Sequence, residues 1–258
     1  APRPRRSAFA AAAAAGRMSM LMTMLMAATS PALLTVGTSK YDPLEYQVPP
    51  LAVPPGSTLF ELMRDLPSYE MSPKYQEVCS IVRDNAALGR KTLVWSTFIR
   101  SLNTMERLLG RYHPAMVHGG TADRERQIAR FREDPSCMVL FSNPATLGEG
   151  ISLHRECHDA VYIDRDFAAG RFLQSLDRIH RLGLPADVRT RITVLGSEGT
   201  IDEVVAARLA VKLDFMGSIL NDPAVQALAD LDEEPPTAGG LSSEDIQALM
   251  GHLHAPSP

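Results

Sequence analysis

Two arginines in the second half of the chain are spaced so that they could act on one ligand. The segment QSLDRIHRLG, residues 174–183, contains Arg178 and Arg181, three positions apart. On a helix, residues three positions apart project from the same face. A guanidinium group donates two parallel hydrogen bonds and stays charged, and both properties suit a phosphate group. A solvated basic helix face is the simpler alternative, and the two residues alone leave it open.

Glycines and hydroxyl-bearing residues follow the ends of several short apolar runs. Strands are predicted at 92–96, 115–118, 138–142 and 160–164, and polar or glycine-rich loops come after each of them. Such loops present backbone N–H groups that suit phosphate oxygens. Along this phosphate-binding rim the sequence offers Ser96, Thr97, Gly120, Thr121, Ser142, Asn143, Glu149 and Gly150.

The elements that must position these residues alternate between strand and helix. Helices are predicted from Pro73 to Gly89, with Ser72 as the N-cap, and at 99–110, 122–131, 170–182 and 201–216; a fifth strand is predicted at 191–195. Alternation of this kind is typical of right-handed crossovers and a mainly parallel sheet. We therefore predict an α/β, three-layer fold with helices on both faces of the sheet. The working loops of such sheets lie at the carboxyl ends of the strands.

Four segments are expected along the chain. Residues 1–34 hold a basic, Ala-rich start and a Met-rich helix, 35–72 a Pro-rich connector without regular helix, 73–220 the α/β domain, and 221–258 an acidic linker and a short C-terminal helix. Ser242 or Ser243 can cap that last helix, which could dock on this domain or on a partner. The apolar run 18–28 is too short to cross a membrane, so we expect no membrane partner and a buried helix instead. The initial Ala suggests a chain cut from something longer.

Composition narrows the function classes. The net charge of −4 argues against a protein that binds nucleic acid by its overall charge, so any such contact would have to be local. Three cysteines are too few for a disulfide framework, which favours a reducing, cytoplasmic compartment. His154, Cys157 and His158 invite a metal interpretation, but no second ligand cluster completes a tetrahedral site, and we expect none.

Four segments resemble a known family in order and spacing. They are KTLVWSTF (91–98), VHGGTADRERQIARF (117–131), VLFSNPATLGEGISLHRECHDAVYID (139–164) and DFAAGRFLQSLDRIHRLG (166–183). They resemble the second RecA-like lobe of Swi/Snf-type ATPases of helicase superfamily two, over roughly residues 18–220. Leu184 replaces a usual Gln, and the loop at 145–150 is about one residue longer than in eukaryotic members. These departures favour a bacterial, nucleoid-associated translocase over a nucleosome remodeller.

The resemblance implies an ATP site between two lobes. Arg181 would be the arginine finger that meets the γ-phosphate, with Arg178 as its companion, Gln174 orienting that phosphate and Asp177 pairing with Arg181. Glu149 and Gly150 would lie near the nucleotide. Ser96, Thr97, Gly120, Thr121, Ser142 and Asn143 would contact the phosphates of a DNA or RNA strand.

The cofactor implied by the resemblance is ATP with Mg²⁺. The sequence contains neither a phosphate-cradling G-x-x-x-x-G-K-[ST] loop nor an acidic pair for magnesium. The magnesium ligands would therefore come from a first RecA-like lobe of the same polypeptide, and this chain alone should not hydrolyse ATP. The alternative is a non-catalytic RecA-like module that docks a partner protein.

Overall fold

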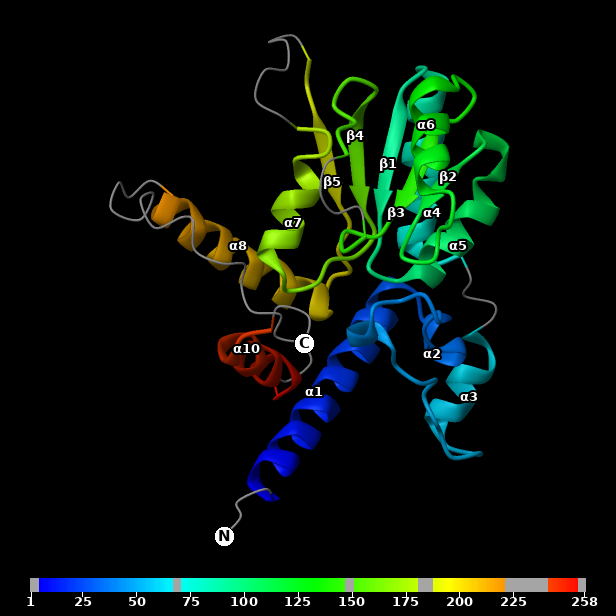
Figure 1. The fold of residues 1–258 in the computed structure, drawn as a ribbon. Coiled ribbons are helices and arrows are strands. Elements are labelled where there is room, and N and C mark those ends of the chain that lie inside the picture. The colour runs from blue at the N-terminus through cyan, green and yellow to red at the C-terminus, as the bar shows by residue number, and fades with distance from the viewer. Residues whose placement is uncertain (1–4, 67–70, 147–150, 181–187, 221–240, 255–258) are drawn as a thin grey trace.

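The computed structural model describes residues 5–66, 71–146, 151–180, 188–220 and 241–254. Within these residues a five-stranded sheet forms the centre of the molecule (Figure 1). Its strands are β1 (Lys91–Trp95), β2 (Ala115–Val117), β3 (Val139–Ser142), β4 (Cys157–Tyr162) and β5 (Arg191–Val194). They lie in the order β2-β3-β1-β4-β5, and every neighbouring pair is parallel. The predicted parallel sheet is confirmed.

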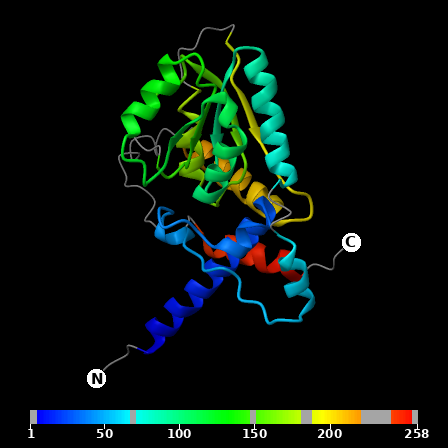
Figure 2. The ribbon, with the colours of Figure 1, turned by 90° about the vertical axis from the view of Figure 1, so that its right-hand side faces the viewer.

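Helices cover both faces of the sheet, as Figures 1 and 2 show. Helices α4 (Pro73–Ala87) and α5 (Ile99–Leu108) pack on one face, and α6 (Arg124–Glu133) and α7 (Ala169–Leu176) pack on the other. Because successive side chains of a strand point to opposite faces, Leu93 and Trp95 of β1 enter the core under α6 and α7, whereas Val94 enters the core under α4 and α5. The predicted three-layer α/β fold is confirmed.

A third core joins the two ends of the chain. It is built from α1 (Arg5–Thr29), α2 (Leu33–Val36), the short 3₁₀ turn η1 (Leu44–Tyr46), α8 (Ile201–Leu220) and α10 (Ser243–His254). Leu21, Met22 and Leu25 of α1 are almost completely buried in this core, together with Leu209 and Leu249. The predicted Met-rich buried helix is thereby confirmed.

The C-terminal helix docks on this chain. The carboxylate of Asp245 lies 2.6 Å from Arg208 Nε and 2.6 Å from Lys212 Nζ, and both cations belong to α8. Asp245 also accepts a hydrogen bond from the backbone N–H of Ser242, while the hydroxyl of Ser242 accepts from the N–H of Asp245, so Ser242 caps the helix. The sequence allowed this helix to dock on its own domain or on a partner, and in the structure it docks on its own domain.

Two sequence predictions are wrong. The connector contains a regular helix, α3 (Thr58–Arg64), because residues 56–66 lack proline and the hydroxyl of Ser57 caps the helix by accepting from Phe60 N at 3.1 Å. Helix α7 ends at Leu176 instead of continuing to residue 182. The carbonyl of Arg178 accepts a 2.7 Å hydrogen bond from Leu153 N, which ties this stretch to the segment before β4.

Candidate functional site

The carboxyl ends of the strands meet at one edge of the sheet, the edge toward α1 and α2 in Figure 1. The register pairs Trp95 of β1 with Ser142 of β3 and with Tyr162 of β4, and Val117 of β2 with Ser142. The loops that follow these strands therefore lie side by side. This is the edge at which the phosphate-binding rim was predicted.

Asp164, just beyond β4, is the centre of the hydrogen bonds at this edge. Its carboxylate accepts from Ser96 Oγ at 2.5 Å, from Thr97 N at 2.7 Å and from the Thr97 hydroxyl. Burial raises the pKa of Asp164 above its ordinary value, and the hydrogen bonds from Ser96 and Thr97 act in the opposite direction. The two hydroxyls after β1 thus hold the β4 loop against the β1 loop.

The last residue of β3 and the residue after it make similar internal hydrogen bonds. Ser142 Oγ donates to the carbonyl of Val117 at 2.7 Å, and Asn143 Nδ2 donates to the carbonyl of Thr97 at 2.7 Å. Ser96, Thr97, Ser142 and Asn143 are all at most 3% exposed. In this structure these four side chains bind other parts of the chain and do not reach solvent. Their predicted contacts with nucleic-acid phosphates therefore lack support here.

The glycine turn after β2 lies at the surface. Thr121 Oγ1 accepts from His118 N at 2.9 Å, and Gly120 N donates to His118 Nδ1 at 3.0 Å. Gly120 is exposed, and the ring of Tyr41 covers it so closely that an added Cβ would lie 2.3 Å from Tyr41 Cδ1. Burial lowers the pKa of His118. Gly120 and Thr121 are the described rim residues that keep an accessible position.

The N-terminal segment covers much of the same edge. Asp42 Oδ1 accepts from Ile99 N at 3.0 Å at the start of α5, and the hydroxyl of Tyr46 donates to Asp166, just after β4. Burial raises the pKa of Asp42 to about 6 and also raises the pKa of Asp166. Arg171 of α7 bridges Glu45 at 2.6 Å and Asp166 at 3.4 Å. These contacts fix the segment over the strand ends.

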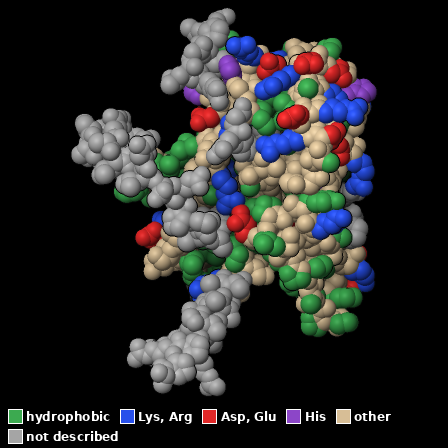
Figure 3. Space-filling model, viewed as in Figure 1, with side chains coloured by type: hydrophobic (Ala, Val, Ile, Leu, Met, Phe, Trp, Pro, Cys, Tyr) green, Lys and Arg blue, Asp and Glu red, His purple; other side chains and the backbone are tan. Residues whose placement is uncertain are grey.

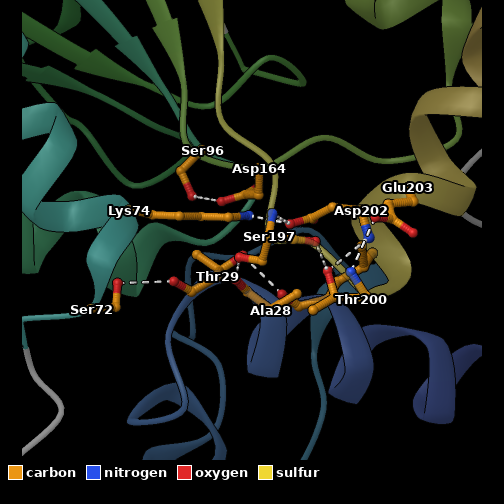
Figure 4. A network of polar contacts seen from close by, with 12 residues as sticks. Ala28, Thr29, Ser72, Lys74, Ser96, Asp164, Ser197, Thr200, Asp202 and Glu203 are labelled. Carbon is orange, nitrogen blue, oxygen red and sulfur yellow. Dashed lines mark hydrogen bonds and ion pairs between the residues drawn. The ribbon is translucent and has the colours of Figure 1, made fainter. Parts of the chain in front are cut away.

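A second polar network, shown in Figure 4, joins α4, α1 and the start of α8 at this edge. Lys74 Nζ lies 2.6 Å from Asp202 Oδ2, and the two side chains are 5% and 9% exposed. Ser72 Oγ donates to Thr29 O at 3.0 Å, and Ser197 Oγ donates to Ala28 O at 3.1 Å. None of these contacts was predicted, because each joins residues that are distant in the sequence.

The arginine segment lies only partly within the described residues. Gln174 and Asp177 are exposed, as an approach by a ligand requires. Arg178 is 7% exposed, follows the end of α7 and donates from Nη1 to the carbonyl of Ile151 at 3.3 Å. The prediction that Arg178 projects from a helix is therefore wrong. Arg181, Glu149 and Gly150 lie outside the described residues, and their roles stay predictions.

One hollow at this edge of the described chain is very small. A hollow of about 10 Å³ is lined by Thr97, Asp164, Arg165, Asp166 and Arg171, among others. That volume is roughly what a single water requires, so this hollow does not enclose a nucleotide. In the view of Figure 3, positive and negative side chains are interspersed over the sheet domain, and hydrophobic side chains gather near α2 and α3. No broad field of one sign covers that face.

The described residues show no sign of a metal site or of a membrane-spanning helix. Within the described parts of the chain, no group of three or more His, Cys, Asp or Glu side chains is arranged to hold a metal ion. Cys157 is buried, which raises the pKa of its thiol to about 12. Among the described helices, none has the length and apolar character needed to span a bilayer.

Comparison with known proteins found similarities that include the sheet domain. Residues 73–183 match the family model described as "Helicase conserved C-terminal domain". The chain is 28% identical over 174 residues to the SWI/SNF chromatin-remodeling complex subunit snf22 of Schizosaccharomyces pombe, a match that covers 66% of this chain and 10% of that protein. It is 27% identical over 157 residues to the transcription regulatory protein SNF2 of Saccharomyces cerevisiae, covering 59% of this chain and 9% of the relative.

One solved structure, the C-terminal part of the Fun30 ATPase domain, is 22% identical, with a TM-score of 0.49 over 58% of this chain and 51% of that one. The chain spans about a tenth of the length of the curated relatives named above. Residues 73–183 are thus similar to a helicase conserved C-terminal domain, and the relatives support a lobe of the Snf2 type.

Proposed function

We propose that this chain is the second motor lobe of an ATP-dependent nucleic-acid translocase. The observation that carries the proposal is the match of residues 73–183 to a helicase C-terminal domain that ends in the segment with Gln174, Asp177, Arg178 and Arg181. The lobe supplies part of an ATP site that a first RecA-like lobe completes with the phosphate loop and the Mg²⁺ ligands. The bacterial origin of the protein is part of the same proposal.

Arg181 is the proposed finger toward the γ-phosphate. A guanidinium group held at a developing phosphoryl charge accelerates hydrolysis by about 10³ to 10⁵ in other ATPases and GTPases. Arg178, with its side chain committed to the carbonyl of Ile151, is better placed to hold the loop before β4 than to reach a separate ligand. Its loss should therefore act on the position of the finger as well as on stability.

The test is an ATPase assay on the full product of the gene, with single-stranded DNA, duplex DNA and RNA as activators. Arg181→Ala should abolish nucleic-acid-stimulated turnover and leave the melting temperature and the affinity for ATP nearly unchanged. The matched control is Arg83→Ala, an exposed arginine of α4 that lies 3.0 Å from Asp84. Normal turnover in Arg181→Ala would remove the finger assignment.

DNA is the proposed track. The relatives include a chromatin-remodeling subunit of Schizosaccharomyces pombe and a DNA excision repair protein ERCC-6-like of Danio rerio, 26% identical over 192 residues and covering 70% of this chain. With four of the predicted phosphate ligands buried, we propose that the exposed turn Gly119–Thr121 makes the contact. Gly120 N and Thr121 N already donate to His118, so Gly119 N and the Thr121 hydroxyl are the groups that would bind phosphates, without reading bases.

The binding module without turnover is the alternative proposal. It predicts that the full gene product binds a partner protein but shows no nucleic-acid-stimulated ATP hydrolysis. The docking of α10 on α8 through Asp245 removes that helix as a free docking element in this structure. The motor interpretation is therefore favoured, and the ATPase assay above decides between the two.

A further inference from the structure

A second cavity lies at the opposite edge of the sheet, at the amino ends of β1, β4 and β5. Its volume is about 560 Å³, within the range of about 300–1,000 Å³ that is usual for small-molecule sites. The polar residues that line it are Arg90, His158, Asp159, Arg189, Thr190 and Arg191. None of them belongs to the rim or to the arginine segment described above.

The charges around this cavity are unequal. Three arginines and one buried carboxylate, that of Asp159, line it, and the Asp159 side chain is 7% exposed. Arg90 Nε lies 3.6 Å from Asp159 Oδ2, and Arg191 Nε lies 3.9 Å from Asp159 Oδ1. Both distances are longer than a hydrogen bond. The site therefore carries excess positive charge and has cations that the carboxylate does not fully engage.

Buried atoms without a hydrogen bond cluster here. Arg90 Nε, His158 Nδ1, Asp159 Oδ1 and Thr190 Oγ1 are shielded from water and make no hydrogen bond. Elsewhere in the described chain the same condition holds only for Ser30 Oγ and Trp95 Nε1. Buried polar atoms are normally satisfied, and leaving one unpaired is costly. Four such atoms around one cavity indicate a missing partner.

We infer that this cavity binds a small phosphate monoester whose alcohol part carries hydroxyl groups, a sugar phosphate being the simplest example. The phosphate accepts hydrogen bonds from Arg189, Thr190 and Arg191. Each guanidinium group can donate two parallel hydrogen bonds to phosphate oxygens. Asp159 repels a bare oxyanion, so the ligand must also bring a donor, and a hydroxyl group supplies it. The small side-chain shifts that bring the shielded atoms to the ligand also satisfy them.

The test is isothermal titration calorimetry of the 258-residue chain with ribose 5-phosphate. One saturable site is expected, with inorganic phosphate and ribose each binding at least about tenfold more weakly. Arg191→Gln should weaken ribose 5-phosphate by about tenfold or more, the usual effect of losing a charge-assisted hydrogen bond. Arg191 is suitable because its side chain is 63% exposed and its loss leaves the core intact. Arg83→Gln, an arginine with a 58% exposed side chain outside the cavity, should change nothing.

Hydrogen exchange locates the ligand. Bound ribose 5-phosphate should protect amides at 157–162 and 188–194 and leave 118–121 unchanged. The inference is overturned by the absence of saturable binding at millimolar ligand, by equal affinity for inorganic phosphate, or by protection at 118–121 alone. Competition by a duplex oligonucleotide as strong as that by the sugar phosphate would also overturn it, because the site would then belong to nucleic acid.

Discussion

Replacing Lys74 with methionine should destabilise the protein far more than replacing an exposed cation on the same helix. Lys74 and Asp202 form a 2.6 Å ion pair whose side chains are 5% and 9% exposed, so Lys74→Met leaves the Asp202 carboxylate inside the protein without its ion-pair partner. Breaking a buried pair in this way costs about 3–5 kcal/mol. Asp202 Oδ2 also accepts from Ser197 N at 2.8 Å, which places the expected loss near the lower end, about 3 kcal/mol.

The assay is urea denaturation followed by circular dichroism, with the free energy of unfolding extrapolated to water. Arg83→Met is the matched control, because Arg83 is also on α4 and its pair with Asp84 is exposed; its cost should stay below about 1 kcal/mol. The double variant Lys74→Met/Asp202→Asn removes both charges and keeps an acceptor for Ser197 N. It should be clearly more stable than the sum of the single losses predicts.

The reasoning fails in either of two ways. If Lys74→Met costs no more than Arg83→Met, the ion pair is solvated and does not join α4 to α8. If the losses of the single variants add in the double variant, the two side chains act independently of each other.

Three further predictions follow from single contacts. Gly120→Ala should cost about 1–3 kcal/mol, because its Cβ would overlap the ring of Tyr41, and Tyr41→Ala in the same chain should relieve the cost, as thermal unfolding can measure. Burial raises the pKa of Asp42 from 3.8 to about 6, so the folded state favours its protonated form; this stabilisation is complete below pH 3.8 and is lost as the pH rises through about 6. Asp42→Asn should therefore gain stability relative to the unmodified protein between about pH 4 and pH 7. A difference in melting temperature between the two proteins that does not change with pH would refute this. Among the cysteines, Cys79 should react first with a thiol reagent in the folded protein, because Cys157 is buried with a pKa of about 12; equal rates at both, measured by peptide mass spectrometry, would contradict it.

The strands and most helices could be predicted because their signals are local. β1 contains the apolar run Leu93–Trp95, which is buried on both faces, and α4 begins at the expected N-cap, where the hydroxyl of Ser72 accepts from Tyr75 N. The high proline content of residues 35–72 as a whole hides the helix α3, which forms in a segment without proline. The local signal for this helix is Ser57, a typical N-cap residue, directly before Thr58–Arg64.

The chemistry at the sheet edge was less predictable than its location. A hydroxyl after a strand has the same sequence pattern whether it binds a phosphate or an internal carboxylate. Ser96 and Asp164 are 68 positions apart, so nothing local indicates their hydrogen bond. The same holds for Tyr46 and Asp166, 120 positions apart. The register that brings these residues together depends on the completed sheet.

The core shared by the two ends of the chain has a consequence for biosynthesis. The apolar face of α1, with Leu21 and Leu25, is buried against residues near 201–213. At about 5–20 residues per second, a ribosome needs roughly 10–40 s to add the intervening stretch. Throughout that interval the nascent helix lacks the surface of α8, and the nearby α2 and η1 can cover only part of it. Chaperone occupancy of the nascent α1 segment should therefore be high and should fall only after α8 has emerged from the exit tunnel.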